Sequence, residues 1–105
     1  MKGFIKMNIN RPDIKALITL TRKNPVKSGY RPAHKIGDYL TTGIQQYYNK
    51  DELKCGETIE GTITFITPEY YPHSLEVGMR LVFQEGERIT GYADIVEIYN
   101  ELLVR

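Results

Sequence analysis

Apolar and polar side chains alternate with a period of two in several separate stretches of this chain, and turn-forming residues separate the stretches. Such alternation is typical of β-strands that bury one face. It is clearest in residues 14–20, 57–67 and 78–84, while residues 39–48 and 88–99 are rich in the Thr, Ile, Val and Tyr that favour strands. Short strands separated by turns predict an all-β barrel or sandwich.

The apolar positions of these strands predict the core. Because alternate residues of a strand share one face, we expect the following side chains to be largely buried: Ile18, Leu20, Ile59, Ile63, Phe65, Leu81, Phe83 and Ile95. The last segment is ambiguous, since Ile95, Ile98 and Leu102 would also share one side of a helix. We favour a strand up to about Tyr99, because no clear helix N-cap precedes the segment.

The chain has 105 residues, the usual size of a single domain. We expect residues 1–12 to form a lead-in segment and residues 13–105 to form a single β-barrel domain. No apolar run approaches the roughly 18 residues of a membrane span, and the first residues do not resemble a signal peptide. The cytoplasm is therefore the expected location, and the net charge of +1 gives no support for a dedicated nucleic-acid binder.

The sequence contains none of the motifs that would indicate a catalytic or cofactor site. It has no phosphate loop, no zinc-protease helix motif and no nucleophile elbow. The single cysteine, Cys55, cannot form an internal disulfide and lacks the companion ligands of a zinc site. His34 and His73 each lie beside a proline-containing turn, and we interpret both as surface or rim histidines. We therefore expect no enzymatic activity, no cofactor and no metal.

Tyrosine is the one over-represented residue type, with 8 copies in the chain. Two adjacent pairs, Tyr47-Tyr48 and Tyr70-Tyr71, suggest that one member of each is buried and the other exposed, as on a strand. Exposed tyrosines favour recognition, because they supply a large contact area. The alternative is that each tyrosine simply fills the barrel wall with its hydroxyl in water.

Three motifs follow one another in the chain. Residues 29–32 read Gly-Tyr-Arg-Pro and precede Thr-Gly-Ile at 42–44, and residues 55–59 read Cys-Gly-Glu-Thr-Ile. Residues 78–91 read Gly-Met-Arg-Leu-Val-Phe-Gln-Glu-Gly-Glu-Arg-Ile-Thr-Gly. In order and spacing these motifs resemble the C-terminal β-barrel domain of elongation factor Tu, over about residues 14–99. The resemblance implies a closed, antiparallel six-stranded barrel without the GTPase domain, and hence no GTP binding.

In that family the barrel contacts the T-stem of transfer RNA, an exchange factor and the GTPase domain. The resemblance places Thr42, Glu85 and Gly86 at T-stem contact positions. Gln84 and Gly37 stand where the family has arginines, and Glu87 replaces a glycine. Since cationic side chains supply most of the affinity for phosphates, these differences predict weak transfer-RNA binding.

The expected function is that of a non-catalytic, stand-alone interaction module that binds a protein partner, either a translation factor or a toxin domain. An immunity or antitoxin protein is one specific form. We predict the binding face to comprise Tyr30, Arg31, Thr42, Glu85, Gly86, Glu87 and Arg88. The alternative is an RNA-binding translation accessory that contacts transfer RNA. A structural role for Arg31 and Arg88, pairing with carboxylates in turns, also remains open, and the basic loop Arg22 to Lys27 is expected to lie apart from this face.

Overall fold

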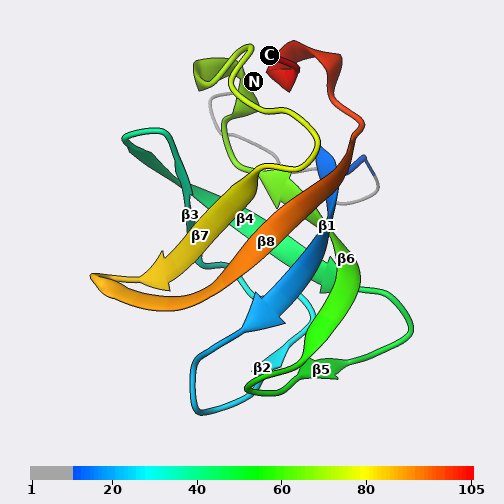
Figure 1. Ribbon diagram of the computed structural model, residues 1–105, viewed down its shortest axis with the longest axis vertical. Coiled ribbons are helices and arrows are strands. Elements are labelled where there is room, and N and C mark those ends of the chain that lie inside the picture. The colour runs from blue at the N-terminus through cyan, green and yellow to red at the C-terminus, as the bar shows by residue number, and fades with distance from the viewer. Residues whose placement is uncertain (1–10) are drawn as a thin grey trace, which may run out of the picture.

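The computed structural model describes residues 11–105, and nearly all of its regular structure is β-strand. Its elements, in chain order, are β1 (Ile14–Leu20), β2 (Val26–Lys27), β3 (Ala33–Ile36), β4 (Tyr39–Tyr47), β5 (Glu52–Leu53), β6 (Thr58–Phe65), the 3-10 helix η1 (Pro68–Tyr70), β7 (Arg80–Glu85), β8 (Arg88–Ile98) and the 3-10 helix η2 (Glu101–Leu103). A closed barrel runs in the order β1-β6-β4-β3-β7-β8, and every neighbouring pair is antiparallel (Figure 1). The predicted closed antiparallel six-stranded barrel is confirmed, while most of the expected lead-in lies outside the described residues.

The barrel interior is filled by the alternate residues that the sequence pattern selects. In β1, for example, Ile14, Ile18 and Leu20 are fully buried, whereas Leu17 is exposed on the outer wall. Every side chain predicted to be in the core is buried except Ile59. Ile59 is half-buried, because it is the second residue of β6 and lies near the rim of the barrel.

The long strand β8 closes the barrel by pairing with both β1 and β7, so the strand interpretation of residues 88–98 is confirmed. Helical structure near this segment is limited to the short turn η2 that follows it. Gly91 allows β8 to pass the core closely. A Cβ atom at this position would lie 2.3 Å from both the Phe83 ring and the Thr19 carbonyl oxygen.

The expectation that His34 is a surface or rim histidine is wrong. His34 lies in β3 and is fully buried in the barrel interior, with its ring packed against those of Phe65 and Phe83 at centroid distances of 5.7 and 5.6 Å. The four-residue strand that carries it is too short to show a period, and it lies between Pro32 and the turn at Gly37. His73, by contrast, is exposed as expected.

A short hydrogen-bond chain holds His34 inside the barrel. The Tyr47 hydroxyl donates to Gln45 Oε1 at 2.9 Å, which turns the Gln45 amide nitrogen towards His34 Nε2 at 3.0 Å. His34 Nε2 must therefore accept, and the ring proton lies on Nδ1, which has no partner among residues 11–105. Burial lowers the pKa of His34 to about 4, so the ring is neutral at physiological pH.

Asp13 ties the start of β1 to two distant segments. Its carboxylate accepts hydrogen bonds from the Phe65 backbone N–H at 2.7 Å and from Asn100 Nδ2 at 2.8 Å. Its carbonyl oxygen accepts from the backbone N–H of Tyr99 at 2.9 Å. Burial raises the pKa of Asp13, although the hydrogen bonds from Phe65 and Asn100 act in the opposite direction. Asp13 thereby joins β1, β6 and the chain after β8.

We expect Asp13→Ala to lower the free energy of unfolding by about 2–4 kcal/mol, since it leaves buried donors without an acceptor. Urea unfolding followed by circular dichroism measures the change. Asp94→Ala is the matched control, because Asp94 bonds to Arg80 on the surface, where an ion pair contributes about 1 kcal/mol or less. Equal losses in the two variants would contradict the role assigned to Asp13.

Candidate functional site

Strand pairing brings the predicted binding residues to one edge of the barrel. Ala33 of β3 pairs with Gln84 of β7 on one side and with Thr42 of β4 on the other, which places the three residues in one row across the wall. Glu85 and Arg88 face each other at the end of the β7–β8 hairpin. Gly86 takes a positive φ of 59° at its tip, a conformation that suits glycine.

Tyr30, just before β3, connects this hairpin to the loop between β1 and β2. Its hydroxyl donates to the Glu85 carboxylate and lies 2.8 Å from the Thr90 hydroxyl. The same Glu85 oxygen forms an ion pair with Arg22, whose Nε donates to the Asn24 carbonyl oxygen at 2.9 Å. One carboxylate therefore holds the β7–β8 hairpin against the distant stretch from Arg22 to Tyr30.

This arrangement changes the acidity of its members. Partial burial, followed by the bond to Glu85, raises the pKa of Tyr30 to about 12. The Tyr30 hydroxyl and the Arg22 guanidinium lower the pKa of Glu85. Glu85 is therefore ionised and fixed in position at neutral pH, rather than free in solvent as its place in a turn would suggest.

The expectation that the basic loop lies apart from the predicted face is wrong. The ion pair between Arg22 and Glu85 joins them, and a concavity of about 270 Å³ lies between the two, lined by Arg22, Lys23, Asn24, Glu85 and Arg88. We call the combined surface of residues 22–31 and 85–88 the loop face. It is larger and more basic than the sequence alone suggests.

Arg31 and Arg88 are exposed, and neither forms a salt bridge with another residue in the range 11–105. The structural reading, in which carboxylates hold them to fix turns, therefore has no support in the described part of the chain. Glu87 is also exposed beside them at the hairpin tip. The loop face thus carries two guanidinium groups that are available to a partner.

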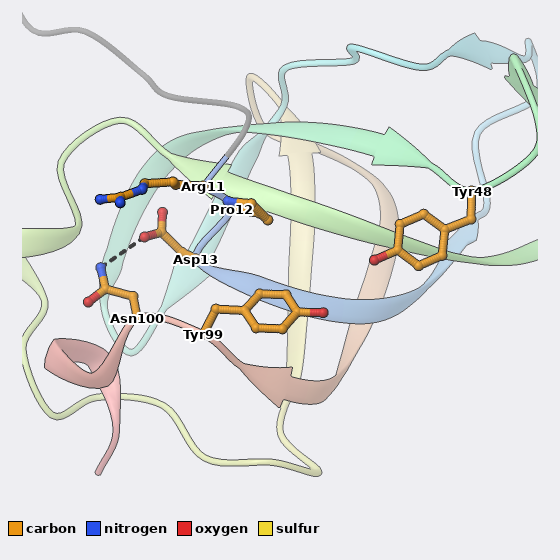
Figure 2. Close-up of a pocket in the computed structure, with 6 residues that line it drawn as sticks. All are labelled: Arg11, Pro12, Asp13, Tyr48, Tyr99 and Asn100. Carbon is orange, nitrogen blue, oxygen red and sulfur yellow. Dashed lines mark hydrogen bonds between the residues drawn. The ribbon is translucent and has the colours of Figure 1, made fainter.

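A second concavity, of about 600 Å³, was not anticipated from the sequence. Tyr48 and Tyr99 point their hydroxyl groups towards each other across β1, and Arg11, Pro12, Asp13 and Asn100 line the other end (Figure 2). Partial desolvation and the neighbouring Tyr48 hydroxyl raise the pKa of Tyr99 to about 12. The only sequence signal for this groove is the Tyr47-Tyr48 pair, of which Tyr47 is buried and Tyr48 exposed, as expected.

Other kinds of site find little support in the described residues. Residues 11–105 contain no group of three or more His, Cys, Asp or Glu side chains arranged to hold a metal ion. None of the helices in this part of the chain is long and apolar enough to span a bilayer. Cys55 is exposed in the turn before β6, with its thiol 3.5 Å from the Thr21 carbonyl oxygen.

Comparison of the chain with protein families and with curated protein sequences found no match.

Proposed function

We propose that this chain is a non-catalytic interaction module that binds a protein partner through the loop face. The network of Tyr30, Glu85 and Arg22 carries the proposal, because it fixes an ion pair and a phenol group from two distant segments in one place before any partner arrives. Groups that are already ordered lose less entropy on binding. Arg31 and Arg88 add exposed guanidinium groups, and arginine and tyrosine are the residue types that most often dominate interface energies.

The mixed signs of the loop face favour a protein partner over a uniform polyanion. Glu85 and Glu87 lie among the cations of this surface, and complementary charges of both signs set the register and the association rate of protein complexes. The resemblance to the elongation factor Tu barrel suggests a translation factor as the partner, while the small size and the tyrosine-rich loops also fit a toxin domain. In the second case the chain would be an immunity or antitoxin protein acting in the cytoplasm.

Capture of partners by the tagged protein from its native cell extract tests the proposal. We expect Arg31→Ala and Arg88→Ala each to weaken retention of a specific protein by about ten-fold or more, as for interface hot spots. Lys35→Ala is the matched control, because Lys35 is an exposed cation of β3 outside the loop face. Retention that is unaffected by both arginine changes would place the partner on another surface.

One observation favours the second candidate function, RNA binding. Lys23 lines one concavity with Arg22 and Arg88, and Lys27 lines another with Arg22, which partly replaces the cations missing relative to the resembled family. We still expect weak binding. In a titration with labelled transfer RNA near physiological salt, the dissociation constant should fall in the non-specific range of about 1–100 µM. Sub-micromolar binding that is lost in a Gly86 variant would favour the RNA-binding function.

A further inference from the structure

Three tyrosines form a groove at the opposite end of β3 from Tyr30. Tyr39 begins β4 after the tight turn at Gly37 and Asp38, while Tyr70 and Tyr71 belong to η1 and the residue after it. Together with the buried floor residue Ile36, they line a concavity of about 250 Å³, which we call the tyrosine groove. The loop face shares no residue with it.

The rings of the tyrosine groove are unusually exposed for aromatic groups. Tyr39 is 66% exposed and Tyr70 is 71% exposed, although Tyr71 packs partly against the core. The rings of Tyr39 and Tyr71 lie 5.8 Å apart between centroids at an angle of 57°. None of the three hydroxyls has a hydrogen-bond partner within residues 11–105. The groove therefore offers ring faces and free phenol donors together.

Hydrogen bonds fix the backbone that carries two of these rings. The Tyr70 and Tyr71 backbone N–H groups donate to the carbonyl oxygens of Thr67 and Pro68 at 3.1 and 3.0 Å. The Ser74 hydroxyl donates to the Tyr71 carbonyl oxygen at 2.5 Å. A groove whose backbone is already fixed loses little conformational entropy when a ligand binds.

The architecture limits what can bind here. The barrel is closed, and although β3 pairs with β7 only through Ala33 and His34, the edge left open at Lys35 and Ile36 is two residues long, too short for an extended peptide to add as a strand. A concavity with a volume of about 250 Å³ is also too small to hold a docked helix of several turns. A polyproline II segment fits better, because its proline rings pack on aromatic faces and its carbonyl oxygens are free to accept from phenol groups.

The charges around the tyrosine groove specify the ligand further. Asp38 lines the groove, and its carboxylate forms no salt bridge within the described chain. Arg105, the cation at this site, is paired with Glu76 at 3.1 Å. The unpaired charge is therefore negative.

We propose that the tyrosine groove binds a proline-rich segment of a partner protein that carries basic residues beside its prolines.

A titration of isotope-labelled protein with an octaproline peptide ending in two arginines, followed by NMR, tests this proposal. We expect saturable shifts at Tyr39, Tyr70 and Tyr71, with a dissociation constant of about 0.1–1 mM for this generic probe. Tyr70→Ala should weaken binding about ten-fold without unfolding the protein, because the ring is mostly in solvent. An octaproline peptide ending in two glutamates should bind more weakly than the basic peptide.

Two variants separate this proposal from the proposed function. Tyr99→Ala removes an exposed tyrosine of the groove in Figure 2 and should leave peptide binding unchanged, as should Arg31→Ala on the loop face. Absence of shifts at millimolar peptide would overturn the proposal. So would shifts confined to other surfaces, or equal binding of the acidic and basic peptides.

Discussion

Phe65→Ala should lower the free energy of unfolding by about 3–5 kcal/mol, the usual range for deleting a core phenylalanine. Phe65 is only 2% exposed, and its ring packs edge-on against His34 at the centre of the barrel. Its removal leaves a cavity that a closed barrel cannot easily collapse to fill. Small domains have a free energy of unfolding of about 5–15 kcal/mol, so this single change would remove a large share of the stability of the protein.

The β7–β8 hairpin supplies a control for Phe65. Ile89 is 59% exposed, so Ile89→Ala should cost less than about 1 kcal/mol. Chemical denaturation of the two variants and the unsubstituted protein measures both changes under the same conditions. Similar small losses in the two variants would contradict the packing described for the barrel interior.

Acidification from pH 6.5 to pH 4 should destabilise the barrel by about 3 kcal/mol through His34 alone. The pKa of His34 is lowered from 6.5 to about 4 in the folded protein. The unfolded chain therefore binds a proton in this interval while the folded chain does not. The contribution of the neutral ring is fully present above pH 6.5 and is lost as the pH falls towards 4.

The carboxyl groups of the protein change its stability with pH in a different way, and their effect must be separated from that of His34. The pKa values of Glu57 and Glu85 are lowered, so their contributions are lost at more acidic pH, and the raised pKa of Asp13 opposes acid unfolding. The comparison of His34→Gln with the unsubstituted protein isolates the histidine, because the difference between their stabilities should change with pH between 6.5 and 4.

NMR titration of the His34 ring provides an independent measurement if the variant does not fold. The imidazole should remain neutral, with its proton on Nδ1, down to about pH 4. A His34 ring that titrates near pH 6.5 in the folded protein would contradict its burial.

The strands with a clear period of two were predictable, and the short ones were not. In β1, β6 and β7 the sequence alternates over enough residues to select side chains that the structure buries. In contrast, β2 and β5 contain two residues each and β3 contains four, so no period can be recognised. The sequence of β3 therefore gives no sign that His34 faces the barrel interior. Barrel closure was expected from the family resemblance, since alternation alone also allows a sandwich.

The candidate sites depend on contacts between distant residues, which limited what the sequence could predict. Motif positions indicated Tyr30 and Glu85, but their hydrogen bond and the ion pair of Glu85 with Arg22 require the barrel to close. The groove in Figure 2 is lined by Tyr48, which follows β4, and by Tyr99, which follows β8. No local sequence pattern indicates it, because these residues are far apart in the chain. The tyrosine pairs were the one useful signal, because each places at least one exposed ring on the surface.

The most direct test of protein binding at the loop face is the amount of protein that the tagged chain captures from native extract after ribonuclease treatment. We predict that a specific protein is still retained after the RNA is digested. The Arg31→Ala variant should retain about ten-fold less of this protein than the unsubstituted chain does. Capture that disappears with ribonuclease would contradict the proposal and indicate that RNA, not protein, is what the loop face binds.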